Sequence, residues 1–456
     1  MDTPAGASPG LEAFGYKQEL KRTLRVRDLF AYGLAMISPI APIAVFGFVF
    51  NASRGMVPLV YIIGLIAMAF TAWSYIAMAK AMPVAGSVYT YAGRSMGPTA
   101  GFLAGWAMLL DYMLVPSLMY LLTAVALTAI IPGLPKWVWI AGMLAVNGAA
   151  NLTGIENTTR LSFILTVLQV VYFVALVLLG VSGALNGLNG AHFTTLPLFN
   201  PEMFSVATMF SALSIAVLSF LGFDAISTLA EEAKDSGRAV AKATALLLPV
   251  ATLLFVIQTY LMCLFLPGLT ELPAGEATDA AGYTIGGLMG GTPMKIAASL
   301  MGGAFATFLS AVTAQAAAAR LMFGMARDRK LPAFLAHVSP GRKVPDRALI
   351  LSMLIAVGLM AVFGDRIDTL ASMVNFGALT GFIFVHLSVI AHYTVKNKDR
   401  RWGRYLVAPV IGLSIIAYVL WNMDVLAKTA GLGWLAAGVI ILIAVRLAGG
   451  KPVSPL

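Results

Sequence analysis

The sequence has little of what enzymes and disulfide-stabilised proteins use. Among its 456 residues are one cysteine, four histidines and only 11% charged residues. The lone Cys263 excludes an internal disulfide framework and a multi-cysteine metal site. The histidines show no metal-ligand spacing, and the chain carries no nucleophile motif and no phosphate-binding glycine loop. We therefore expect neither an enzyme nor a bound cofactor or metal.

The chain is rich in long apolar runs. Hydrophobic residues make up 59% of it, which is too apolar for a soluble domain. A membrane-spanning helix needs roughly 20 apolar residues. By this criterion the sequence predicts an all-α membrane protein of about twelve transmembrane helices, at approximately 28–50, 56–80, 99–131, 136–154, 160–186, 205–230, 243–267, 282–319, 348–364, 368–393, 405–424 and 430–448.

The cations predict how the chain crosses the bilayer. If the amino terminus is cytoplasmic, only five of the 30 Lys and Arg residues fall in loops on the outer side, namely Arg54, Lys136, Lys295, Arg366 and Lys428. This satisfies the positive-inside rule and places both termini in the cytoplasm. The net charge of +10 follows from that rule, so we expect no nucleic-acid partner.

Two apolar runs are interrupted at matching points. GLAMISPIAPIAVFGFVF contains Pro39, Pro42 and Gly47, and LSFLGFDAISTLAEE contains Gly222 and Asp224. Proline and glycine break helices, and a broken helix at bilayer depth usually lines a cavity. The breaks fall in the first helix of each of two groups of five, which predicts a five-plus-five inverted repeat and a secondary transporter whose substrate binds at the breaks.

Ionisable residues inside a membrane are costly and are candidates for function. Asp224 lies at the second break, where it could bind a cationic amine or a proton, or could cap a half-helix that starts at Ala225. Asp111 lies near the middle of its helix and could face the cavity or bond to a broken helix. Glu231 could share a face with Asp224 or belong to the cytoplasmic mouth. His386 could relay protons or be a packed interior histidine.

Aromatic residues lie close to both breaks. Phe46, Tyr112, Phe220 and Phe223 could close over a bound amine through cation–π contact, or could belong to the core.

Three further motifs add a family resemblance. PVAGSVYTYAGRSMG, SFLGFDAISTLAEEAKD and ARLMFGMARDRKLPAF together resemble the amino acid–polyamine–organocation permeases over essentially the whole chain. WAMLLDYMLVP and MVNFGALTGFIFVHLSVI look most like the bacterial putrescine importers. The resemblance implies a LeuT-like fold with ten core helices and two extra helices, alternating access, and proton-driven uptake of an amine or amino acid across the cytoplasmic membrane.

The resemblance also implies a substrate site. The segment from Ser38 to Gly47, including Pro42, Ala44 and Phe46, takes the place of the family's first substrate-binding loop, and the segment from Gly222 to Ala225 takes that of the second. Asp224 occupies the position where polyamine carriers have an acidic residue. Three positions depart from the family: Ala41-Pro42-Ile43 replaces a glycine-rich turn, Ala44 stands where a putrescine importer would have Asp, and Gln169 replaces a lysine.

These observations predict three parts of the chain: a cytoplasmic tail at 1–27, a transport core at 28–393, and two further helices with a cytoplasmic tail at 394–456. The expected function is import of a small amine-bearing solute, with putrescine first and a neutral or cationic amino acid as the alternative. A channel or a nutrient sensor on a transporter scaffold is the alternative from another class. The few buried charges argue against a continuous polar pore.

Overall fold

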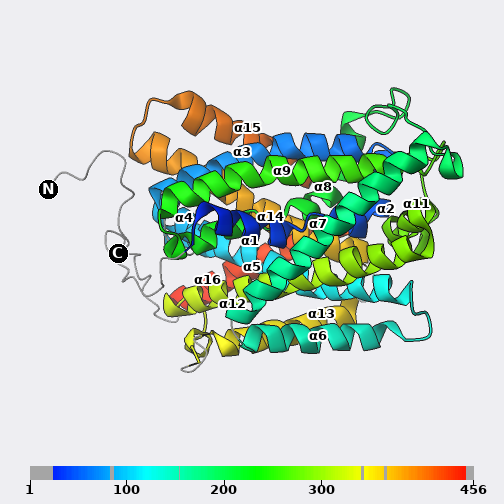
Figure 1. Ribbon diagram of the computed structural model, residues 1–456. Coiled ribbons are helices and arrows are strands. Elements are labelled where there is room, and N and C mark those ends of the chain that lie inside the picture. The colour runs from blue at the N-terminus through cyan, green and yellow to red at the C-terminus, as the bar shows by residue number, and fades with distance from the viewer. Residues whose placement is uncertain (1–23, 83–86, 154, 340–343, 364–366, 448–456) are drawn as a thin grey trace.

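Figure 1 shows the computed structural model of the chain, a bundle of helices that run roughly parallel to one another. The structure describes residues 24–82, 87–153, 155–339, 344–363 and 367–447. Within these ranges every regular element is helical, and one isolated bridge joins Leu24 to Ala233. The predicted all-α fold is confirmed.

The predicted apolar runs correspond to the helices of the bundle. Eight spans within the described residues are long and apolar enough to cross a membrane, and the bent pair α1–α2 gives a ninth. Two helices of 18 residues and a shorter apolar segment of 15 residues account for the other three of the twelve predicted runs. In chain order the elements are α1 (Val26–Ile37), α2 (Pro42–Ser53), α3 (Val57–Ala81), α4 (Ser87–Met96), α5 (Pro98–Thr128), α6 (Lys136–Thr153), α7 (Ile155–Leu185), η2 (Leu188–Gly190), α8 (Val206–Ala216), η3 (Val217–Phe220), η4 (Asp224–Glu232), α9 (Ser236–Leu264), α10 (Glu276–Asp279), α11 (Ala281–Ala298), η5 (Ser299–Phe305), α12 (Ala306–Arg327), η6 (Ala333–Ala336), α13 (Asp346–Phe363), α14 (Ile367–Val389), η7 (Ile390–Lys396), η8 (Gly403–Val407), α15 (Ala408–Trp421) and α16 (Val425–Leu447).

The span that corresponds to the helix predicted at 282–319 is longer than predicted. Helical structure continues for 47 residues, from Ala281 to Arg327. A straight helix of that length would measure roughly 70 Å, more than twice the hydrocarbon thickness of a bilayer. The backbone bends at Gly290 and at Gly291, where φ is +70°, so the first part of α11 can leave the direction of α12. The region between the helices predicted at 56–80 and 99–131 also contains a helix, α4.

Packing places α5 at the centre of the bundle. Its side chains are buried along almost its whole length, and it contacts α4, α12 and α14. By contrast, α7 leaves large apolar side chains such as Phe163, Val171, Leu178 and Leu185 exposed. An apolar outer surface of this kind fits a lipid environment.

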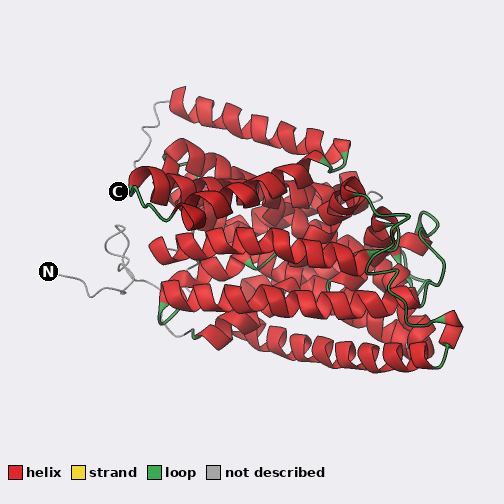
Figure 2. Ribbon diagram, turned by 90° about the horizontal axis from the view of Figure 1, so that it is seen from above, coloured by secondary structure: helices red, strands yellow, loops and turns green. Residues whose placement is uncertain are grey.

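The two ends of the bundle differ. Figure 1 shows that the chain enters α1 and leaves α16 at the same end, as an even number of crossings requires. Figure 2 shows the longest loops at the opposite end, where residues 186–205 and 265–280 connect the helices.

Candidate functional site

The first broken helix confirms the interruption predicted at Pro39. The break is shorter than the predicted segment from Ser38 to Gly47, because Pro42 begins α2 and Gly47 lies inside that helix. α1 ends at Ile37, α2 begins at Pro42, and the two helix axes are bent by 55°. The backbone turns at Ser38, where φ is +63°. Such a turn frees backbone groups that must find other partners inside a membrane.

Two glutamines from neighbouring helices bind the residues of this turn, one of them at a freed backbone carbonyl. Gln258 of α9 donates from Nε2 to the carbonyl oxygen of Pro39 at 3.0 Å. The hydroxyl of Ser38 donates to Oε1 of Gln169 on α7 at 2.8 Å. Gln169 therefore contacts the first break directly.

The second break is held by its own carboxylate. η3 ends at Phe220, the backbone turns at Gly222 with φ +111°, and η4 begins at Asp224. Oδ1 of Asp224 accepts the backbone N–H of Gly222 at 3.2 Å, and Oδ2 accepts the hydroxyl of Tyr112 on α5 at 2.9 Å. Asp224 therefore braces the turn before η4.

The two breaks touch each other. A Cβ atom added at Gly222 would lie 3.1 Å from Cβ of Met36 and 3.5 Å from the backbone nitrogen of Ile37. Glycine allows this approach without displacement, since a side chain here would be tight against the last turn of α1. The two interrupted segments, far apart in sequence, thus meet at the centre of the protein.

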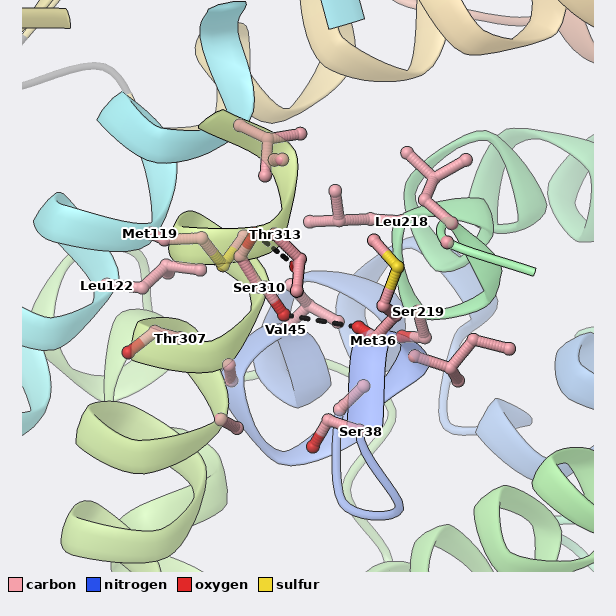
Figure 3. A pocket seen from close by; sticks show the side chains of 18 of the residues that line it. Met36, Ser38, Val45, Met119, Leu122, Leu218, Ser219, Thr307, Ser310 and Thr313 are labelled. Atoms are coloured by element: carbon pink, nitrogen blue, oxygen red, sulfur yellow. Dashed lines mark hydrogen bonds between the residues drawn. The ribbon is translucent and has the colours of Figure 1, made fainter. Parts of the chain in front are cut away.

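A cavity of about 70 Å³ lies beside the breaks. One water molecule needs about 10–15 Å³ by this measure, so there is room for roughly five waters or a solute of that size. Figure 3 shows the two methionines and the α12 hydroxyls of the lining. The cavity is lined by Met36, Ile37, Ser38, Ala41, Ala44, Val45, Asp111, Tyr112, Val115, Met119, Leu122, Leu218, Ser219, Leu221, Gly222, Gly302, Ala306, Thr307, Ser310, Thr313 and Ala314.

The lining is mainly apolar and contains a single charged residue, Asp111, among the described residues. The Asp111 side chain is 3% exposed. Its Oδ1 has no hydrogen-bond partner in the described part of the protein. No Lys, Arg or His occurs among the lining residues that the structure describes. The same residues contain no group of three or more His, Cys, Asp or Glu side chains that could hold a metal ion.

Five of the residues predicted for substrate binding or coupling line this cavity: Ser38, Ala44, Asp111, Tyr112 and Gly222. Others are buried outside the lining and pack elsewhere. Phe46 stacks on Phe50, Phe220 packs against Tyr61 and Phe255, and Phe223 packs against Tyr75 and Phe382. Pro42, Gly47 and Asp224 are also buried outside the lining. The side chain of Glu231 lies outside the described part of the protein.

His386 lies away from the cavity. Its ring nitrogens contact the hydroxyls of Thr71 at 3.3 Å and Ser74 at 2.9 Å, both on α3.

The α12 hydroxyls were not predicted as site residues. Thr307, Ser310 and Thr313 follow one another at intervals of three residues and line the cavity, and the hydroxyl of Thr307 lies 2.6 Å from that of Thr123 on α5. Their spacing in GGAFATFLSAVTAQ is a helical face that the sequence alone could have indicated.

Comparison with known proteins adds independent information. Residues 33–426 match the amino acid permease family. The low-affinity putrescine importer PlaP of Escherichia coli strain K12 is 32% identical over 441 residues, which cover 95% of this chain and 96% of that protein. The branched-chain amino acid permease BcaP of Bacillus subtilis strain 168 is 27% identical over 463 residues, covering 93% of each chain. The methylthioribose transporter of the same organism is 25% identical over 455 residues, covering 94% and 95%.

Proposed function

Since this chain belongs to the amino acid permease family, we propose that it imports a small diamine, with putrescine as the first candidate. That it is a membrane transporter for amine-bearing solutes follows from the family and from the relatives reported above. The observation that carries the diamine proposal is Asp111, which lines an otherwise uncharged cavity beside two helix breaks and whose buried Oδ1 has no partner among the described residues. The similarity to a putrescine importer supports it.

The proposal includes a mechanism of alternating access. The half-helices that meet at Gly222 and Met36 would tilt to open the cavity first to one side of the membrane and then to the other. Residues 28–393 would form this transport core, with 394–456 adding two helices and a tail. The buried Asp111 and Asp224 are candidates to carry a proton with the substrate, because a buried carboxylate is stabilised by either a cation or a proton.

We also propose which membrane the protein occupies and on which side its termini lie. The distribution of Lys and Arg supports an orientation with both termini in the cytoplasm, and the similarity to bacterial permeases supports the cytoplasmic membrane. No part of the proposed mechanism needs a cofactor or a metal.

A neutral amino acid is the second candidate. Two of the relatives are branched-chain amino acid permeases, and the apolar lining from Val45, Val115 and Leu122 could contact an aliphatic side chain.

The test is uptake into proteoliposomes that contain the purified full-length protein. Labelled putrescine, leucine and lysine are compared with and without an imposed gradient, acidic outside. We expect putrescine to accumulate, and to accumulate faster with the gradient. Liposomes without protein are the control. Uptake of leucine without putrescine would favour the second candidate, and an unchanged rate without the gradient would contradict proton coupling.

A further inference from the structure

We propose that the two buried acids have different tasks: Asp111 binds an ammonium group of the substrate, whereas Asp224 is a positioning residue. We further infer that the cavity selects solutes that bring hydrogen-bond donors at both ends. The substrate class is therefore an alkyl diamine rather than an amino acid. This inference rests on the proposed amine transport and assigns residues and selectivity to it.

Asp224 is already engaged by the protein. One carboxylate oxygen accepts the N–H of Gly222 and the other accepts the hydroxyl of Tyr112. Asp224 is also absent from the described residues that line the cavity. Both of its oxygens therefore already hold the second break, and an ammonium group that bound Asp224 would compete with these contacts. Asp224 fixes the position of Tyr112 and of the turn at Gly222, and it affects substrate only through these two.

Asp111 has the complementary properties. It lines the cavity, it is almost fully buried, and Oδ1 lacks a partner among the described residues. Its backbone is fixed, because Gly377 of α14 packs so closely that an added Cβ would lie 2.7 Å from the Asp111 nitrogen. A buried carboxylate without a partner is costly, and a cation in the cavity relieves that cost. A rigid, unpaired acid is suited to bind an ammonium group.

The first break offers few donors to a substrate carboxylate. The backbone N–H groups of Ile40, Ala41, Ile43 and Ala44 all donate to oxygens within the break. The two prolines of this segment have no N–H at all. A substrate carboxylate needs hydrogen-bond donors. The backbone between residues 39 and 44 has no free N–H group left to bind such a carboxylate.

The hydroxyls of α12 have also used their donors. Thr307 and Thr313 donate to carbonyl groups four residues earlier, at 2.6 and 2.7 Å. Ser310 donates to the carbonyl of Met36 at 3.4 Å, as Figure 3 shows. A hydroxyl has one donor and two acceptor sites, so the oxygens of Ser310 and Thr313 remain able to accept, whereas that of Thr307 is paired with the hydroxyl of Thr123. This wall suits a second ammonium group, which brings only donors.

The experiment uses three solutes with the same four-carbon chain. Putrescine carries two ammonium groups, 1-butylamine one, and 4-aminobutyrate one ammonium and one carboxylate. Each competes with labelled putrescine for binding to the purified full-length protein. We expect putrescine to compete best, butylamine less well and 4-aminobutyrate least. Equal competition by 4-aminobutyrate overturns the selectivity argument, and this measurement needs no variant.

Variants separate the two acids. Asp111→Asn is expected to weaken putrescine binding about 30-fold or more, the usual effect of removing one partner of a buried charge pair. Asp224→Asn should keep binding within about threefold and lower the maximal uptake rate instead. Asp235→Asn, at an exposed carboxylate next to η4, is the matched control and should behave as wild type. Ser310→Ala should reduce the preference for putrescine over butylamine.

The outcomes distinguish this inference from the proposed function. If wild type neither binds nor transports putrescine, the proposed function fails and the inference fails with it. If wild type transports putrescine while Asp111→Asn binds it normally, or while Asp224→Asn alone loses binding, only the division of tasks is wrong. Should Asp111→Asn fail to fold, Asp111→Glu and the solute series still decide the question.

Discussion

Replacing Gly222 by alanine tests whether the second break must keep its observed shape. Gly222 has φ +111°, a conformation that residues with a side chain rarely adopt. The added methyl group would also lie 3.1 Å from Cβ of Met36 and 3.4 Å from its carbonyl carbon. Those atoms belong to the other broken helix and not to the end of a flexible side chain, so one of the two breaks has to move.

The size of the effect follows from these two observations. A residue in a sparsely populated backbone conformation costs about 1–3 kcal/mol. Taking about 2 kcal/mol for backbone strain and contact together, the population of the observed arrangement falls roughly 30-fold relative to conformations in which the breaks separate. If transport passes through the observed arrangement, the initial rate of uptake should fall by about the same factor.

The assay is the initial rate of putrescine uptake into proteoliposomes, with the thermal unfolding midpoint measured on the same preparations. The matched control is Gly358→Ala on α13, where an added Cβ meets no described atom within 4 Å. Alanine there can stabilise the helix by up to about 1 kcal/mol, so uptake should be unchanged. If Gly222→Ala transports as fast and unfolds at the same temperature as Gly358→Ala, the second break does not need glycine at position 222.

Three further predictions use other contacts. Tyr112→Phe leaves one oxygen of Asp224 without its donor, at a cost of about 1–3 kcal/mol, and should slow uptake about tenfold at unchanged protein yield. Gln258→Leu removes the donor to a carbonyl of the first break and should lower the thermal unfolding midpoint, measured in detergent. The hydrogen bond from Arg401 lowers the pKa of Asp399 to about 2. This stabilisation is present above the unfolded pKa near 3.9 and is lost as the pH falls through 2. Asp399→Asn should therefore leave the pH profile of uptake between about pH 5 and 8 unchanged, and a shifted profile would contradict this assignment.

The sequence predicts the helix breaks well because their cause is local. Pro39, Pro42 and Gly222 act on their own backbone, so an apolar run that contains them is readable as a broken helix without knowledge of its neighbours. The contact between the breaks is also predictable in outline, since matching interruptions in two halves of a transporter meet at one site.

The tasks of the acidic residues could not be predicted in the same way. Asp111 and Asp224 differ in which oxygens have partners, and those partners depend on how α5 packs against the second break. The bond between Ser38 and Gln169 joins residues 131 positions apart and has no local signal. Phe220 lies close to a break in sequence, yet its ring packs into the core, because proximity along the chain does not determine which face a side chain takes.

The most direct test of amine transport by alternating access is counterflow in proteoliposomes. Vesicles that contain the purified protein are loaded with unlabelled putrescine and diluted into a trace of labelled putrescine, with no ion gradient. A carrier with a single cavity exchanges the label inward, so the internal label should rise transiently above its equilibrium value and then decline. Vesicles preloaded with 4-aminobutyrate should show a much smaller rise. A smooth approach to equilibrium without a transient maximum would indicate a channel, and no uptake of label at all would contradict putrescine as the substrate.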